Sequence, residues 1–377
     1  MSTNPYHPGF GRSPSVLAGR DALIADVVDS LDGSGAGFGR LLVGDRGVGK
    51  TVLLNAIEGR ARELGWAVVT RQIIRGSAVE GLLDALPDAL EDSWGPRPKI
   101  RKLTAEVTVG INVGVAKVET KVSPKDTRAV SPAYALERNL TRIGEHCLEH
   151  RYGAGVLISL DEAHKLQPSE VEVLGSVMQV VIERRELPIV VLLAGLPDLI
   201  ETLRAGGTFL ERLERRQVGL LTAAQARTAL TGAARTAGAT VTPEAAALLA
   251  DASGGYPYFV QIYGHATWDA AGGASTITAA HARAGIRGAA ERIESLYAER
   301  WDSLPEGQQQ YLSVMATFDE PASVADIARA LDRTLQQLSP IRDRLIKDHH
   351  MIKAAGRGRL VFALPGFRAW LRASPSS

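Results

Sequence analysis

Eight consecutive residues have the types and spacing needed to hold a phosphate group. Residues 44–51 read GDRGVGKT and fit the pattern G-x-x-x-x-G-K-[ST] at each fixed position. Glycines let the loop curl so that successive backbone N–H groups point inward at a phosphate. Lys50 can reach the β- and γ-phosphates of a nucleotide, and the Thr51 hydroxyl can bind Mg²⁺. The motif predicts that ATP and Mg²⁺ bind at Gly44, Asp45, Arg46, Gly47, Val48, Gly49, Lys50, Thr51 and Val52.

Two adjacent carboxylates end an apolar run farther along the chain, where residues 156–164 read VLISLDEAH. Strands inside a parallel sheet are apolar on both faces, so Asp161 and Glu162 are expected at the strand tip, where ligands bind. Asp161 would hold Mg²⁺ directly or through water, and Glu162 would orient and polarise the attacking water. The letters DEAH also occur in a helicase class. The chain has one P-loop core and no other helicase signature, which argues against that class.

The sequence around these motifs predicts the elements that position them. Apolar runs at 41–43, 66–70, 155–160 and 187–194 are expected to be buried strands. Helical patterns cover 22–31, 51–64, 79–90, 133–150 and 169–183. Strands that alternate with helices favour a parallel sheet between helical layers. The expected fold class is therefore α/β, a P-loop NTPase with an αβα parallel sheet.

The second half of the chain is expected to be mainly helical. Alanine-rich helices near 222–236, 243–252, 257–271 and 278–300 would form a lid, with Thr222 and Thr242 as N-caps. Helices at 308–318, 324–331 and 335–347 and strands at 351–355 and 360–363 predict a C-terminal winged helix-turn-helix. The expected domains are an extended arm at 1–15, an ATPase core at 16–221, a lid at 222–300 and a winged helix at 301–377.

A stretch with period-2 alternation interrupts the ATPase core. Residues 103–122 contain EVTVGINVGVAKVETKV, which predicts a β-hairpin inserted at about 97–128. Its rims are basic, with Arg97, Lys99, Arg101, Lys102, Lys117, Lys121, Lys125 and Arg128. Two interpretations stay open: a strand pair that contacts DNA or a neighbouring subunit, or a solvated hairpin with a charged rim.

Composition narrows the class of protein. Of 377 residues, 45% are hydrophobic, and the net charge is +1, so only local charge can argue for nucleic acid. The single cysteine, Cys147, excludes an internal disulfide and a cysteine metal cluster, and its helical context predicts a packed side chain. No apolar run reaches membrane-spanning length, and the first residues show no basic-then-apolar signal. We therefore expect a cytoplasmic protein without membrane contact.

Positive charge gathers in the expected winged helix. Between residues 333 and 372 nine basic residues are interrupted by two acidic ones. Such a patch is typical of a surface that meets a phosphate backbone, so double-stranded DNA is the expected partner. The candidate contacts on the third helix and at the wing tip are Gln336, Gln337, Arg342, Arg344, Arg357 and Arg359. The alternative is a winged helix that contacts only protein.

With these motifs, residues 10–375 resemble AAA+ and STAND-type P-loop ATPases, near the archaeal-type ATPase and origin-initiator families. The resemblance implies a base or hinge contact at the "GR" turn, by Val16, Leu17 and Arg20. It also implies an arginine finger within TFLERLERR, where Arg212 matches best and Arg215 second, and hence a homo-oligomer in the ATP-bound state. Gly255-Tyr-Pro257 resembles the G-x-P signature of this group, which implies that Tyr256 and Pro257 lie near the adenine.

The chain departs from these relatives at two positions. A polar residue that senses the γ-phosphate is expected at the tip of the strand at 187–194, but only Ala194, Gly195 and Leu196 stand there. The arginine of a second sensor is also missing beside Gly255. The first hypothesis is an ATP-dependent switch that couples nucleotide state to DNA binding, with Lys50, Glu162 and Arg212 in catalysis. The second is a signalling or scaffold ATPase with slow hydrolysis, whose winged helix binds protein.

Overall fold

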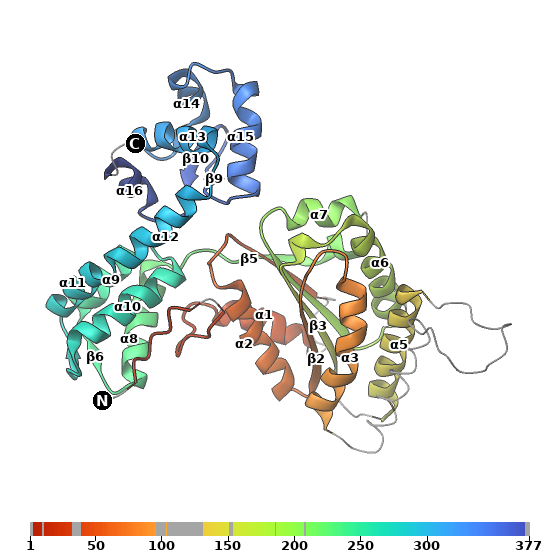
Figure 1. The fold of residues 1–377 in the computed structure, drawn as a ribbon. Helices are drawn as coiled ribbons and strands as arrows, with labels where there is room; N and C mark the ends of the chain where they lie inside the picture. Colours follow the sequence, from red (N-terminus) through yellow and green to blue (C-terminus); the bar gives the residue numbers. More distant parts are fainter. Residues whose placement is uncertain are drawn as a thin grey trace, which may run out of the picture. The chain divides into compact units, whose positions relative to one another are not determined.

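The computed structural model describes residues 3–9, 11–31, 39–95, 103, 131–150, 154–184, 186–206 and 209–373. These residues form two compact units (Figure 1). The sheet unit comprises Arg20–Gly44 and Lys50–Val218, and the helical unit comprises Met1–Gly19, Asp45–Gly49 and Gly219–Ser377. Apart from Leu103, the predicted hairpin at 103–122 and its basic rims lie outside the described residues.

Five parallel strands form the centre of the sheet unit. They are β1 (Gly39–Val43), β2 (Trp66–Gln72), β3 (Gly155–Asp161), β4 (Ile189–Gly195) and β5 (Glu214–Gln217), in the order β2-β3-β4-β1-β5. Every residue of β1, β3 and β4 is buried. This matches the apolar runs that predicted them, because both faces of a parallel sheet are covered. The predicted αβα P-loop fold is confirmed.

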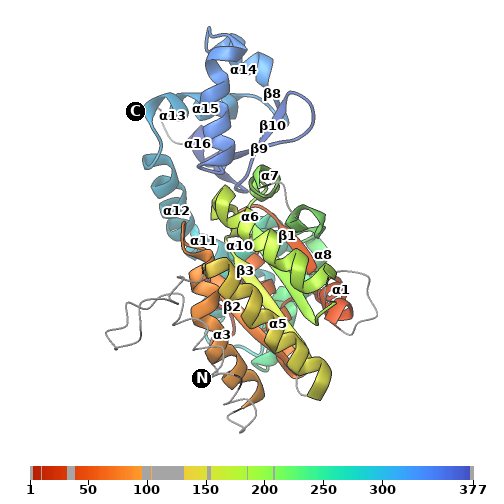
Figure 2. The same ribbon diagram turned by 90° about the vertical axis from the view of Figure 1, so that its right-hand side faces the viewer.

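Helices cover both faces of this sheet (Figures 1 and 2). Helices α1 (Asp21–Leu31) and α2 (Lys50–Glu63) lie on one face, and α3 (Ala78–Trp94), α5 (Pro132–His150) and α6 (Pro168–Met178) lie on the other. A π-helical turn, Gln179–Arg184, extends α6 over most of the range predicted for one helix. The short helix α7 (Leu199–Ala205) was not predicted. Cys147 is buried on α5, as its helical context predicted.

An ion-pair network ties α1 to the edge of the sheet. Arg40 on β1 lies with its side chain 8% exposed, and its Nε donates to Asp26 at 2.8 Å. Arg216 on β5 contacts the same carboxylate at 2.8 Å and Glu214 at 2.8 Å. Burial acts to raise the pKa of Asp26, but hydrogen bonds from Arg216 and Arg40 outweigh it and lower that pKa. Arg216 therefore has a structural role in this network.

Five helices follow the sheet unit in the chain and belong to the helical unit. They are α8 (Ala223–Thr236), α9 (Pro243–Ser253), α10 (Pro257–Ala271), α11 (Ala279–Gly288) and α12 (Ala290–Asp302). A two-stranded parallel pair, β6 (Thr240–Val241) and β7 (Thr276–Ile277), joins two of their connections. The side chains of Thr222 and Thr242 cap α8 and α9 as predicted. The helix predicted at 278–300 is wrong as one piece. Helix α11 ends at Gly288 and α12 begins at Ala290. Glycine is a poor helix former, which favours a break at this point.

The N-terminal arm packs against these helices. It has no regular structure in its described residues, as expected of an extended arm. Tyr6 is 2% exposed, and its hydroxyl donates to the Leu230 carbonyl at 2.6 Å. Asn4 donates to the His265 carbonyl and the Asp269 carboxylate. The arm is thus part of the core of the helical unit, a role that its Pro-, Gly- and Ser-rich composition did not predict.

The last part of the chain has the element order of a winged helix. Helices α13 (Glu306–Thr317), α14 (Val324–Ala330) and α15 (Leu335–Lys347) precede β9 (Ile352–Ala354), β10 (Arg359–Phe362) and α16 (Phe367–Ala373). A two-residue strand, β8 (Ala322–Ser323), completes an antiparallel sheet of order β8-β10-β9. Phe367 and Trp370 of α16 pack on Tyr297 of α12. In the described part of the chain, no helix has both the length and the hydrophobicity to cross a membrane.

Candidate nucleotide-binding site

The predicted phosphate loop joins the end of β1 to the start of α2. The Gly44 N–H donates to the Gly195 carbonyl at 3.2 Å, which fixes the start of the loop against β4. Lys50 is 7% exposed, and its Nζ donates to the Gly44 carbonyl at 2.9 Å, so its side chain folds back along the loop. Backbone N–H groups at the N-terminus of α2 and the Lys50 ammonium are the donors that a phosphate needs.

The two predicted metal ligands lie in contact. The Thr51 hydroxyl, in the first turn of α2, donates to Asp161 Oδ2 at 2.6 Å. Asp161 is the last residue of β3 and is 8% exposed. A hydroxyl and a carboxylate are hard oxygen ligands of the kind that Mg²⁺ takes beside phosphate oxygens and water. Among the described residues no group of three His, Cys, Asp or Glu side chains could hold a metal.

Glu162 follows directly and has an unusual backbone. Its φ of 55° lies in the left-handed region, which non-glycine residues rarely adopt, and its N–H donates to Asp161 Oδ1 at 2.8 Å. The Glu162 carboxylate lies 2.9 Å from Lys165 Nζ and 3.8 Å from His164 Nε2. Burial acts to raise its pKa, but Lys165, His164 and Lys50 together lower it. Glu162 is therefore a carboxylate at neutral pH.

His164 occupies a position that sequence reasoning missed. The Leu196 N–H, at the tip of β4, donates to His164 Nδ1 at 3.5 Å, which puts the proton of the neutral ring on Nε2, the nitrogen that faces Glu162. Burial lowers the pKa of His164, although Glu162 acts to raise it. The β4 tip holds no polar side chain of its own, but the imidazole of His164, from the 3₁₀ turn Ala163–Lys165 that follows β3, lies against it. The histidine in DEAH was the available signal.

Residues at the tip of the loop belong to the helical unit and contact other residues of that unit. The Tyr256 hydroxyl donates to the Arg46 carbonyl at 3.1 Å, and Tyr256 is 5% exposed. A Cβ on Gly47, whose φ is 79°, would lie 1.9 Å from the Tyr256 hydroxyl oxygen, so the site needs glycine. Lys353 Nζ on β9 lies 3.2 Å from Asp45 Oδ2. The loop tip therefore has side-chain partners at the N-cap of α10 and on β9.

The residues assigned by resemblance are placed as follows. Val16 would contact a Cβ on Gly232 of α8, Leu17 is half-buried, and Arg20 is 6% exposed, with a pKa lowered by burial. Pro257 is the first residue of α10, and Tyr256 is its N-cap. The roles of these residues in nucleotide contact stay predictions.

The arginine candidates differ in their surroundings. Arg212, in a 3₁₀ turn of Phe209–Arg212, pairs with Glu183 at 3.2 Å and leaves 64% of its side chain exposed. Arg215 is exposed and donates to the Gln217 side chain at 3.2 Å. A surface ion pair contributes little to stability, so little holds Arg212 in place. A role for it at a neighbour's nucleotide stays a prediction.

The predicted DNA contacts fall into two groups. Gln336, Arg344 and Arg357 are exposed. The other three have local partners: Gln337 completes the capping box of Thr334, Arg342 contacts Ser339 and Asp343, and Arg359 donates to the Pro321 carbonyl at 3.2 Å. Two further basic residues of the patch, Arg368 and Arg372, bind Asp319 and carbonyls at the end of α13. The exposed charge is smaller than the sequence count indicated.

Two family models match the sequence. Residues 16–193 match the AAA ATPase domain, and residues 294–371 match a domain of unknown function (DUF8462). A search of the curated proteins found no match.

The matches to solved structures cover nearly the whole length of the chain. The Walker-type ATPase PABY2304 of Pyrococcus abyssi is 16% identical, with 94% of this chain and 96% of that chain covered and a TM-score of 0.61. The Orc1 protein of Aeropyrum pernix, solved in complex with DNA, is 19% identical over 96% and 94% of the two chains, with a TM-score of 0.46. At 16% identity, the first match shows a shared fold.

Proposed function

We propose that the chain is a molecular switch whose ATP state controls DNA binding by the winged helix. The match of residues 16–193 to the AAA ATPase domain supports ATP binding. The observation that carries the ATP-binding part of the proposal is the contact of Thr51 Oγ1 with Asp161 Oδ2 at 2.6 Å. It brings the two motifs, which lie far apart in the sequence, to one point beside Lys50. A site of this composition fits Mg·ATP.

Each residue of the site has a defined task. Mg²⁺, held by Thr51 and Asp161, would neutralise phosphate charge when bound. Lys50 supplies an ammonium to the β- and γ-phosphates, and the loop N–H groups hold the phosphate oxygens. The Glu162 carboxylate accepts a hydrogen bond from the attacking water and orients it.

His164 is a positioning residue in this proposal. Its Nδ1 is anchored on the β4 backbone and its Nε2 faces Glu162 at 3.8 Å, so the imidazole limits where the carboxylate can lie. It also takes the place, at the strand tip, of the polar residue that the sequence lacks.

Replacing His164 with Ala is expected to lower kcat for ATP by about tenfold, which corresponds to about 1.4 kcal/mol, with the ATP dissociation constant unchanged. Protonation of His164 at acid pH would prevent Nδ1 from accepting the Leu196 N–H, so wild-type activity should fall as the pH drops through the lowered pKa of His164. The variant should lose that acid limb. An unchanged pH profile in the variant would show that His164 only fills space.

Arg212 completes the proposed active site from a neighbouring subunit. Among the partners that the described residues offer, its exposed guanidinium pairs with Glu183 at the surface, and it can leave that pair at little cost. Its charge would stabilise the transition state at the neighbour's γ-phosphate. This part of the proposal requires that ATP promote association of the chain.

DNA binding is proposed for the exposed basic residues of α15 and the wing. Arg344 and Arg357 project into solvent, where a guanidinium can pair with a phosphate oxygen. Binding of duplex DNA by the full chain should weaken steeply with salt, and each phosphate contact contributes about 0.9 to the logarithmic slope.

Replacing Arg344 or Arg357 with Ala should therefore lower the salt slope by about 1 and weaken binding to all sequences alike. Arg287→Ala, on an exposed position of α11, serves as the control and should leave the slope unchanged. Fluorescence anisotropy at several salt concentrations measures both quantities. A full chain without salt-dependent DNA affinity would instead favour the second candidate, a signalling ATPase whose winged helix binds protein, to which the internal use of Arg368 and Arg372 also points.

A further inference from the structure

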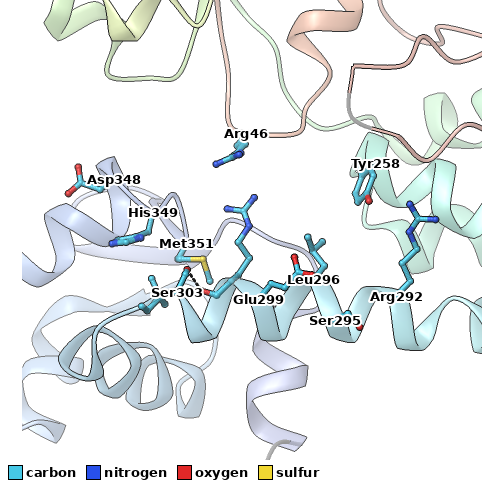
Figure 3. Close-up of a pocket in the computed structure, with 12 residues that line it drawn as sticks. Arg46, Tyr258, Arg292, Ser295, Leu296, Glu299, Ser303, Asp348, His349 and Met351 are labelled. Atoms are coloured by element: carbon cyan, nitrogen blue, oxygen red, sulfur yellow. Dashed lines mark hydrogen bonds between the residues drawn. The ribbon is translucent and has the colours of Figure 1, made fainter. Parts of the chain in front are cut away.

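A groove in the helical unit lies beside α12, and among the described residues of its lining Arg46 is the one that belongs to the phosphate motif. Its volume is about 580 Å³. The α12 residues that line it recur at helical spacing along one face, and the remainder comes from the loop tip, the start of α10 and the connection between α15 and β9 (Figure 3). Its lining includes no residue of the Mg·ATP set Lys50, Thr51, Asp161 and Glu162.

Arg46 and Arg300 bring two positive charges to the groove. Arg46 projects from the loop tip toward the groove (Figure 3), and Arg300 lies on α12. Among the described residues, neither guanidinium has an ion-pair or hydrogen-bond partner. Burial, and then the nearby charge of Arg46, lower the pKa of Arg300. Arg46 is exposed and Arg300 is half-buried, so the penalty falls mainly on Arg300, from its burial first and then from the like charge of Arg46, and a bound anion would offset that repulsion.

The other groove residues offer a different chemistry. Glu299 and Asp348 can accept hydrogen bonds, as can the hydroxyls of Ser295 and Ser303. Tyr258 presents an aromatic ring on the right of the view, and Met351 lies to the left, beside His349 (Figure 3). A long run of phosphates would be repelled by the two carboxylates. A compact ligand would match these groups if it carried one anionic group for the arginines, several hydrogen-bond donors for the acceptors and a flat ring for Tyr258.

We propose that this groove binds a nucleoside phosphate as a second, regulatory ligand, with its phosphate held between Arg46 and Arg300. The volume lies within the range of small-molecule sites, and the paired donors of two guanidiniums match phosphate oxygens. Because Arg46 belongs to the phosphate loop and its carbonyl accepts from Tyr256, occupancy of the groove bears directly on the conformation of that loop. The site does not depend on hydrolysis or DNA binding.

The test uses the full chain with Lys50→Ala, which removes ATP binding at the loop, and AMP as the probe. AMP lacks the β- and γ-phosphates that Lys50 is expected to hold. Isothermal titration should find one AMP per chain. Adding Arg300→Met should weaken AMP binding by about tenfold or more, which is the effect of one lost charge-assisted contact. Arg287→Met, on exposed α11, is the matched control and should bind as Lys50→Ala does.

Several results would overturn the proposal. One is that AMP at millimolar concentration gives no heat of binding. Another is that AMP binds the Arg300→Met variant as tightly as it binds Lys50→Ala alone. Inorganic phosphate binding as tightly as AMP would remove the nucleoside from the proposal. Loss of duplex DNA affinity in Arg300→Met with AMP binding intact would make the groove a nucleic-acid contact instead. If Arg300→Met does not fold, Arg46→Met, on an exposed loop residue, makes the same test. The Mg·ATP site is tested separately, by comparing ATP binding of the wild type and of Lys50→Ala. A negative AMP result would therefore overturn the groove proposal and would not bear on the Mg·ATP site.

Discussion

Replacing Glu162 with Gln is expected to stop ATP hydrolysis and leave ATP bound. The amide keeps the size of the side chain, but it removes the carboxylate that would orient water. A positioned base contributes about 10²- to 10⁴-fold to a rate, so kcat should fall within that range. Lys50, Thr51 and Asp161 are unchanged in this variant, so the ATP dissociation constant should stay within about twofold of the wild type. Single-turnover phosphate release measures the first quantity and equilibrium dialysis the second.

Glu172→Gln is the matched control, because Glu172 is an exposed carboxylate on α6 of the same unit. It should hydrolyse ATP at the wild-type rate. Unchanged turnover in Glu162→Gln would show that another group activates the water and that the left-handed backbone at Glu162 has no catalytic purpose.

Replacing Lys50 with Ala is expected to abolish ATP binding at micromolar concentration. The Lys50 ammonium is the one charged donor in the loop that is expected to reach the β- and γ-phosphates. Loss of two charge-assisted hydrogen bonds, at about 1.5 kcal/mol each, weakens binding by about two orders of magnitude. Equilibrium dialysis with labelled ATP measures the loss.

Arg60→Ala removes an exposed cation from the same helix and serves as the control, since Arg60 pairs only with Glu63 among the described residues. It should retain ATP as the wild type does. If Lys50→Ala retained ATP equally well, the loop would not be the nucleotide site.

The strand, loop and helix that carry the phosphate motif were predicted correctly because their determinants are local. A glycine-rich loop between a strand and a helix, and carboxylates after an apolar strand, each follow from a few adjacent residues. Parallel strands place their carboxyl ends at one edge, so the meeting of Thr51 and Asp161 could be expected. The observed 2.6 Å contact depends on that topology.

What the sequence did not predict depends on contacts between distant residues. His164 reaches the β4 backbone only because β3 and β4 are neighbours in the sheet. The two-residue strands β6, β7 and β8 are too short to show a period, and Tyr6 is buried by helices more than two hundred residues away. The charge count over residues 333–372 overestimated the exposed positive charge that DNA could contact. The partners of Arg368 and Arg372 lie before residue 333, so the count did not include them.

The central claim is that the nucleotide in the loop sets the affinity of the chain for DNA. The most direct test measures duplex DNA affinity of the Glu162→Gln chain by anisotropy, at fixed salt, with Mg·ATP, with Mg·ADP and without nucleotide. A switch requires that DNA bind the two nucleotide states differently, and a coupling of about 1–3 kcal/mol is typical, so the dissociation constants should differ by about five- to 150-fold. Equal dissociation constants in all three conditions would show that the nucleotide does not control DNA binding by this chain.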